Sequence, residues 1–341
     1  MKGLIQSVAV FLGMAAAIAV TLAVFGVDVG QGLGYLWQGA AVGPVAIGRT
    51  LVKATPLALC GLGIVVAWRA GMYNIGGEGQ YVFGGIGGAA CAKILAGVSP
   101  GGLSPLLLAS GTLLGAGVGA FAGWLHVKRG VQVVISTILM NFLALFTLEW
   151  VIRGPLQEAK RQVFVTDPLP NAAMLMRFDR QSDLHVGVFA TLAAATGVWL
   201  YLWHTRAGLD LRVVGGAPRA ARANHIDVGR IQIGAMALSG GLCGLAGAID
   251  YVGVTGRLAD GFSQNWGFIA IPVALLGGLN PWGVLASSLY FGGLFAGSDV
   301  LKRFTPIGNS LVPAIQGLAV LAFIGVNAVF SRHQTRSGEV E

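Results

Sequence analysis

Charged side chains are scarce in this sequence. Only 11% of its 341 residues are Asp, Glu, Lys or Arg and 55% are hydrophobic, whereas soluble domains contain about 25% charged residues. This composition excludes a soluble globular protein and predicts an integral membrane protein. Although the formal net charge is +8, no basic run is interleaved with aromatic side chains. We therefore expect cations that flank membrane spans and contact the lipid bilayer, and no nucleic acid partner.

Patterns of cysteine and of catalytic residues are also sparse. Cys60, Cys91 and Cys243 lie singly in apolar runs, which argues against a disulfide framework and against a bound metal. No lysine follows a glycine, so the phosphate-binding G-x-x-x-x-G-K-[ST] loop is absent. The stretch GVSPG at 97–101 fits the G-x-S-x-G nucleophile pattern, but Pro100 lacks the N–H that an oxyanion hole needs. The sequence predicts no enzyme activity, no catalytic residue and no cofactor of its own.

Long apolar runs make up most of the chain. A membrane-spanning helix takes about 20 apolar residues. Ten runs reach or approach that length, at 4–25, 51–67, 81–96, 103–125, 131–152, 186–203, 231–254, 268–279, 284–297 and 311–330. Several are short or interrupted by Gly and Pro, as broken or re-entrant helices are. We predict one all-α transmembrane domain over residues 1–341, with about eight to ten spans.

Glycine is abundant, with 54 residues, and one set is regularly spaced. Gly111, Gly115, Gly119 and Gly123 recur every four residues and so line one face of a helix. Small residues on one face allow two helix backbones to approach closely in lipid. We expect a second helix against this stripe, the alternative being a helix that merely tolerates glycine toward lipid.

Two polar segments separate the apolar runs in the second half of the chain. Segment 204–230 carries more cations than acids, with Arg206, Arg212, Arg219, Arg222 and Arg230 against Asp210 and Asp227. Segment 153–184 is more nearly balanced. Because cytoplasmic loops carry an excess of Lys and Arg, we predict that 204–230 is cytoplasmic and 153–184 external.

A short helix is predicted within the cytoplasmic segment. It begins at Pro218, whose fixed φ suits the first helical position. The helix carries small side chains at Ala220, Ala221 and Ala223, which allow it to fit closely into a partner's cleft. Its charged side chains, Arg219 and Arg222, can reach carboxylates or lipid phosphates. The alternative is a plain charged connector.

The stretch GMYNIGGEGQY, residues 71–81, places polar side chains between two apolar runs. Its four glycines allow the backbone to leave helical geometry. Such backbone persists at membrane depth only where it is buried in protein or lines a water-filled cavity. Asn74, Glu78 and Gln80 therefore either face a transport path or pin the loop by satisfying its backbone groups. Both alternatives stay open.

Two further sets of polar residues lie in apolar surroundings. Asn141 is in the middle of the 131–152 run, where it either contacts a substrate or bonds to a neighbouring helix. Gln264, Asn265 and Trp266 follow Phe262 just before the 268–279 run. If the halves of the chain are inverted repeats, this stretch mirrors the Asn74 loop across the pathway.

Several of these segments resemble one family of transport proteins. They are NIGGEGQ, VVISTILMNFLAL, GLDLRVVGGAPRAARANHIDVGR with the following SGGLCGLAGA, and IPVALLGGLNPWG. They are similar to permeases of ATP-binding-cassette importers for nucleosides and simple sugars, most of all the nucleoside type. The resemblance covers nearly the whole chain.

The resemblance implies a type II importer architecture in a bacterial inner membrane. It implies a second permease subunit, identical or related, two cytoplasmic ATP-binding subunits that hydrolyse the ATP, and an external substrate-binding protein. It also assigns a coupling helix that transmits ATPase closure, at Pro218, Arg219, Ala220, Ala221, Arg222, Ala223 and Ile226. The chain departs from the family at Ala217, where Asn is usual, and at His225, where Gly is usual.

A secondary carrier that moves its substrate with a proton or sodium gradient is the alternative function. Such a carrier needs ionisable groups inside its spans, and Glu78, Glu149, Asp250 and Asp299 are the candidates. All four lie near predicted span ends.

Overall fold

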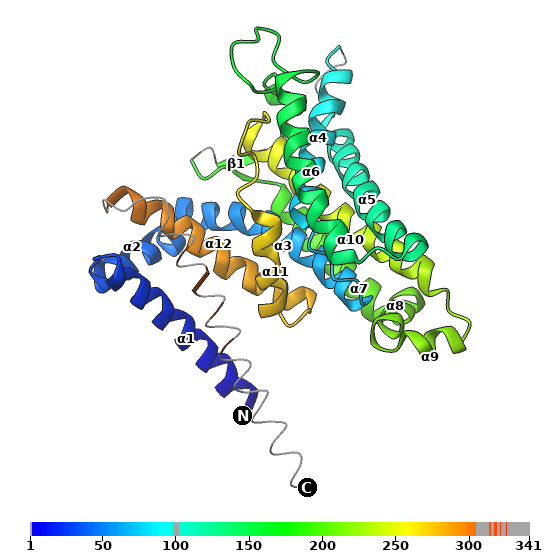
Figure 1. The fold of residues 1–341 in the computed structure, drawn as a ribbon. Helices are drawn as coiled ribbons and strands as arrows, with labels where there is room; N and C mark the ends of the chain where they lie inside the picture. The colour runs from blue at the N-terminus through cyan, green and yellow to red at the C-terminus, as the bar shows by residue number, and fades with distance from the viewer. Residues whose placement is uncertain are drawn as a thin grey trace. The chain divides into compact units, whose positions relative to one another are not determined.

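The computed structural model describes residues 2–97, 102–179 and 181–304, with five single positions between 314 and 325 (Figure 1). The predicted run 311–330 falls largely outside these residues, as does most of the GVSPG stretch. The regular elements of the described part are helices, apart from two short strands. The chain divides into two units, residues 1–50 with 292–341, and residues 51–291.

The first unit contains the two N-terminal helices and the end of the last described one. Helix α1 (Lys2–Val24) and α2 (Val29–Ala41) meet at a bend of 120°. The Asp28 side chain caps α2 by accepting the Gln31 N–H at 2.8 Å. Helix α2 packs on the final part of α12 (Pro281–Phe304), since Gly39 leaves room for the backbone of Gly297.

The second unit holds the other helices. In chain order they are α3 (Pro44–Arg69, shared with the first unit), α4 (Gly77–Ile94), α5 (Ser104–Arg129), α6 (Val133–Arg153), α7 (Gly187–His204), α8 (Arg206–Gly216), α9 (Pro218–Ala223), α10 (Val228–Asp250), the π-helical turn η2 (Tyr251–Thr255), α11 (Trp266–Leu276) and the start of α12. Between α6 and α7 lie a 3-10 turn η1 (Asn171–Ala173) and the antiparallel strands β1 (Arg177–Asp179) and β2 (Leu184–His185).

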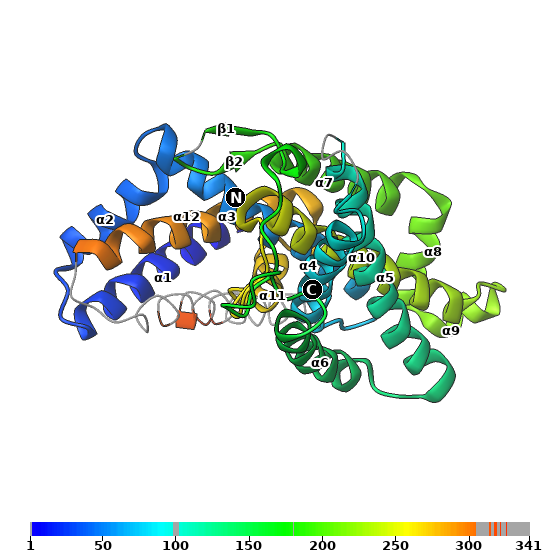
Figure 2. The same cartoon turned by 90° about the horizontal axis from the view of Figure 1, so that it is seen from above.

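Helices α4, α5 and α10 pack together at the centre of this unit, side by side in Figure 2. The glycine stripe of α5 faces α10. A methyl group added at Gly115 would lie 2.7 Å from the Cα of Gly244 in α10, and one added at Gly84 in α4 would lie 2.6 Å from the same atom. Backbone therefore touches backbone in this trio, as small residues permit in lipid.

Five helices in the described residues are long and apolar enough to cross a membrane: α3, α5, α6, α10 with η2, and α12. The bent pair α1–α2 makes up to six if it counts as one span. The chain is thus an all-α polytopic membrane protein. The predicted runs 268–279 and 284–297 differ from the structure in detail, because α11 has only 11 residues while 284–297 is part of the 24-residue α12.

Candidate functional site

The backbone leaves helical geometry between α3 and α4, at the polar stretch predicted from the sequence. Helix α3 ends at Arg69 and α4 begins at Gly77. Gly71 has a φ of +75°, which the left-handed turn after α3 requires. A side chain at this glycine would also meet Gly215 of α8 at 3.4 Å. Apart from the exposed Gly71 and Tyr73, the segment is packed within protein, as irregular backbone at membrane depth must be unless it lines a water-filled cavity.

Asn74 is the hub of this loop. Its Oδ1 accepts the Gly76 N–H at 2.8 Å, which turns the chain into α4. Its Nδ2 donates to Gln80 Oε1 and to Ser239 Oγ of α10, both at 2.9 Å. One fully buried amide therefore ties the loop, the first turn of α4 and α10 together.

Asn141 of α6 holds the same turn from the other side. Its Oδ1 accepts the Gly79 N–H at 2.8 Å, and its Nδ2 donates to the Ile75 carbonyl at 3.0 Å. The hydroxyl of Thr137, one turn earlier on α6, accepts the Ile75 N–H at 3.3 Å. Asn141 thus satisfies two backbone groups that the break between α3 and α4 leaves without helical partners.

Glu78 joins α4 to α11. Its Oε2 accepts the Gly267 N–H at 2.8 Å, in the first turn of α11. Gly267 also lies directly on the backbone of Glu78, with no space for a Cβ. Both helices begin at this point, so the carboxylate lies at two helix N-termini, where a negative charge is favourable. Asn265 before α11 has a φ of +64°, a left-handed conformation that Asn tolerates.

The residues predicted to line a pathway fall into two groups. Asn74, Glu78, Gln80 and Asn141 are exposed by 2% or less, and all bond within the chain. This is the arrangement expected of the pinning alternative, while a pathway role stays a prediction. Gln264 and Asn265 are exposed and Trp266 is buried. Phe262 of the same stretch stacks on Tyr81, with ring centroids 5.3 Å apart, so the two polar stretches lie against each other.

Another interaction between distant segments joins α4 to the end of α10. The Tyr81 hydroxyl donates to Asp250 Oδ2. Neither residue is a predicted site residue, although Asp250 is one of the four ionisable groups near predicted span ends. The signal that could have identified the pair is the rarity of carboxylates within spans.

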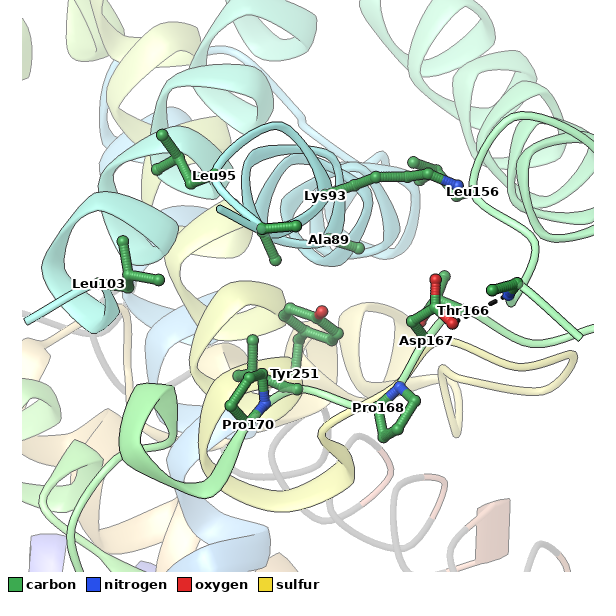
Figure 3. Close-up of a pocket in the computed structure, with 14 residues that line it drawn as sticks. Ala89, Lys93, Leu95, Leu103, Leu156, Thr166, Asp167, Pro168, Pro170 and Tyr251 are labelled. Carbon is green, nitrogen blue, oxygen red and sulfur yellow. Dashed lines mark hydrogen bonds between the residues drawn. The ribbon is translucent and has the colours of Figure 1, made fainter. Parts of the chain in front are cut away.

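A cavity of about 590 Å³ opens at the far end of α4 (Figure 3). It lies between that end of the helix, the start of α5, η2 and the predicted external segment, which contributes Leu156, Ala159 and residues 166–170. The external segment is fixed there by backbone bonds, such as Thr166 N–H to Leu258 O at 3.0 Å and Leu169 N–H to Gly256 O at 2.8 Å.

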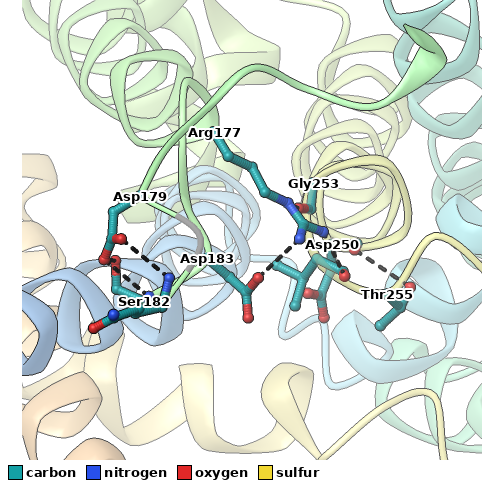
Figure 4. A network of polar contacts seen from close by, with 9 residues as sticks. Arg177, Asp179, Ser182, Asp183, Asp250, Gly253 and Thr255 are labelled. Carbon is teal, nitrogen blue, oxygen red and sulfur yellow. Dashed lines mark hydrogen bonds and ion pairs between the residues drawn. The ribbon is translucent and has the colours of Figure 1, made fainter. Parts of the chain in front are cut away.

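The hairpin β1–β2 in the same segment is tied to η2 by Arg177 (Figure 4). Its Nε and one terminal nitrogen donate to the carbonyls of Gly253 and Val254 at 3.0 and 2.9 Å, and the other terminal nitrogen pairs with Asp183 at 2.9 Å. His185 is buried beside it, and its Nδ1 accepts the Gly187 N–H at 3.0 Å. Burial, with Arg177 nearby, lowers the pKa of His185 from 6.5 to about 4.

The predicted short helix is α9, which begins at Pro218 and ends at Ala223. Ala221 is buried between Val214 and Val228, and Ile226 packs against the same cluster. The predicted coupling residues Pro218, Arg219, Ala220, Arg222 and Ala223 are exposed. The helix therefore rests on one alanine and presents its other residues outward.

His225 occupies the left-handed position in the turn that ends α9. The Ile226 N–H donates to the Ala221 carbonyl at 3.0 Å and the His225 N–H to the Arg222 carbonyl at 3.1 Å, the two bonds of a Schellman motif. His225 has a φ of +59°, the left-handed position that favours glycine. At the start of α9, Ala217 makes no side-chain capping bond.

Comparison with known proteins identifies the family. The family model described as branched-chain amino acid transport system / permease component matches residues 46–324. The chain belongs to this permease family. The resemblance seen in the sequence is thereby confirmed, and the permease is a transport component of an ATP-binding-cassette system and not an enzyme.

Relatives of the permease align along most of its length. A guanosine ABC transporter permease protein of Bacillus subtilis is 32% identical over 93% of this chain and 92% of its own. A nucleoside ABC transporter permease protein of Lactococcus lactis is 29% identical over 96% and 92%, and a glucose ABC transporter permease protein of Haloferax volcanii 28% identical over 92% and 85%. No solved structure matches the permease.

Proposed function

We propose that the permease forms the membrane pathway for a nucleoside in a bacterial inner membrane. An external substrate-binding protein delivers the nucleoside, and two cytoplasmic ATP-binding subunits drive transport. A second permease subunit, identical or related, completes the pathway. The permease itself binds no cofactor, because ATP is hydrolysed on the partner subunits.

The similarity to the guanosine and nucleoside permeases, over more than nine-tenths of both chains, carries this proposal. The similarity to a glucose permease keeps simple sugars as the competing substrate class. The structure supports the coupling step through α9. Its exposed Arg219 and Arg222 flank the small exposed residue Ala220, a surface that a cleft lined with carboxylates can accept closely.

Reconstitution tests the proposal. The permease is co-expressed with the proposed ATP-binding subunits, purified and placed in liposomes with the binding protein. We expect guanosine uptake that requires ATP and is insensitive to proton and sodium ionophores. Glucose uptake in place of guanosine uptake would correct the substrate class. Uptake by the permease alone under an ion gradient would establish the secondary carrier instead.

A substitution on α9 tests the coupling surface. Ala220→Trp places a large side chain on the exposed face and leaves the buried Ala221 untouched. We expect the affinity for the ATP-binding subunits to fall about fivefold to 150-fold, measured as a loss of co-purified subunits, since overpacking typically costs about 1–3 kcal/mol. Ala207→Trp, at an exposed alanine of α8, is the matched control and leaves assembly intact.

A further inference from the structure

The cavity at the end of α4 has mostly apolar walls. Ala89 and Ala92 come from α4, Leu103 precedes α5, and Pro168 and Pro170 belong to the external segment. Its volume of about 590 Å³ lies within the range of roughly 300–1,000 Å³ typical of small-molecule sites. The apolar lining suits a flat or aliphatic part of a ligand.

Tyr251 supplies a polar group to this cavity. The residue is 2% exposed, and Figure 3 shows its hydroxyl turned into the cavity between Ala89 and Asp167. The Tyr251 hydroxyl forms no hydrogen bond with any residue that the structure describes, although the backbone of Tyr251 is bonded. The hydroxyl oxygen itself is open to the cavity, so it is available to donate or accept a hydrogen bond with a molecule bound there.

Two opposite charges complete the lining. Asp167 accepts the Ala159 N–H through Oδ1 at 3.0 Å, which leaves its other oxygen for a ligand. The Lys93 ammonium lies 3.5 Å from the Gln157 carbonyl. Both residues are exposed, so they face the opening while Tyr251 lies deeper. A carboxylate and an ammonium together carry no net charge, which favours an uncharged ligand with hydroxyl groups over an anion or a cation.

We propose that this cavity is a receiving site for an uncharged nucleoside on the external side of the permease. The base lies along the apolar wall, the Tyr251 hydroxyl donates to an acceptor on it, and the sugar hydroxyls bond to Asp167 and Lys93. This inference rests on the nucleoside transport proposed above. The site lies toward the opposite end of α4 from the Asn74 loop, beginning at Ala89, roughly 18 Å along the helix from Gly77.

Photolabelling of the complete transporter in lipid nanodiscs tests the site directly. The probe is 8-azidoguanosine, added without the binding protein, and the labelled peptides are mapped by mass spectrometry. We expect labelling within residues 156–170 or at Tyr251, prevented by excess guanosine. A cavity that instead holds a phospholipid, seen by native mass spectrometry and not displaced by guanosine, overturns the proposal.

Three substitutions test the polar side chains and the free volume of the cavity. Tyr251→Phe and Asp167→Asn each remove one polar interaction, and Asn at 167 keeps an oxygen for the Ala159 N–H. Each should raise the half-saturating probe concentration about twofold to tenfold, as the loss of a single hydrogen bond does. Ala92→Trp fills the cavity and should abolish specific labelling. Tyr201→Phe and Asp260→Asn, which lie outside the lining, are the matched controls.

Guanosine uptake by the same variants separates this proposal from the general function. If the wild type transports guanosine with ATP and the variants raise KM with little change in the maximal rate, the site takes part in transport. If the wild type transports guanosine but all three variants label and transport like it, the receiving site is refuted and the proposed function stands. If the wild type transports no nucleoside, the proposed function fails first. Co-purification of the partner subunits shows that each variant is folded.

Discussion

Replacing Glu78 by glutamine removes the charge that joins α4 to α11 while it keeps the length of the side chain. The carboxylate accepts the Gly267 N–H at 2.8 Å. A hydrogen bond to a charged acceptor contributes about 1.5–3 kcal/mol, and a neutral one about 0.5–1.5 kcal/mol. The loss of charge at the N-termini of two helices adds up to about 2 kcal/mol in a partly buried geometry. Because glutamine also relieves the cost of burying a charge, we expect Glu78→Gln to destabilise the permease by no more than about 1–3 kcal/mol.

Thermal unfolding of the purified complex measures this effect. The fraction of intact complex is determined by size-exclusion chromatography after heating to each temperature. The midpoint should fall by several degrees, and guanosine uptake should fall with the amount of assembled complex. Glu149→Gln on α6 makes the same chemical change at a half-buried position away from α11 and should leave both unchanged. If Glu78→Gln assembles and unfolds like the wild type yet transports nothing, the carboxylate acts on the substrate path and does not mainly pin the loop.

Four other changes have outcomes that the structure specifies. Asn141→Leu leaves two buried backbone groups without partners and should cost about 2–4 kcal/mol in thermal stability. Gly115→Val forces a side chain onto the backbone of α10 and should prevent accumulation of folded protein in membranes, whereas Gly117→Val, where nothing lies within 4 Å, should be tolerated. His225→Gly relieves a left-handed conformation and should stabilise the end of α9 by about 0.5–1 kcal/mol, seen as slower hydrogen exchange there. The pKa of His185 is lowered to about 4 in the folded protein, so folding requires the neutral imidazole. The folding stability that depends on neutral His185 is therefore fully present above pH 6.5 and is lost as the pH falls toward 4. Over that range the external segment should lose up to about 3 kcal/mol of stability, measured as faster limited proteolysis. If proteolysis of His185→Gln accelerates in the same way as the pH falls, protonation of His185 is not the cause.

Features set by local periodicity could be predicted from the sequence. The spacing of Gly111, Gly115, Gly119 and Gly123 defines a helix face whatever its neighbour is, and the structure places α10 against it. Pro218 likewise marks the start of α9. His225 stands where the resembling family usually has glycine, and this difference could be seen in the sequence. The positive φ at His225 explains why glycine is usual there.

Features that depend on distant partners could not be predicted. Glu78 bonds to Gly267, 189 positions away, and no local pattern encodes that pairing. The cavity at the end of α4 is formed by α4, the external segment and η2, so it exists only after these elements pack. The hairpin β1–β2 is held by Arg177 through carbonyls of η2, and backbone acceptors leave no mark in the sequence. The sequence left two alternatives open for Asn74, because its partners Gln80 and Ser239 become known only from the folded structure.

Direct backbone contact among α4, α5 and α10 restricts how this permease can move. Two helices separated by long side chains can slide when those side chains change rotamer, but Gly115 and Gly244 have no side chains to rearrange. Shear within the trio would drive one main chain into another. A transport cycle therefore has to displace these three helices as a single rigid piece, with its joints at the irregular segments that lead into and out of them.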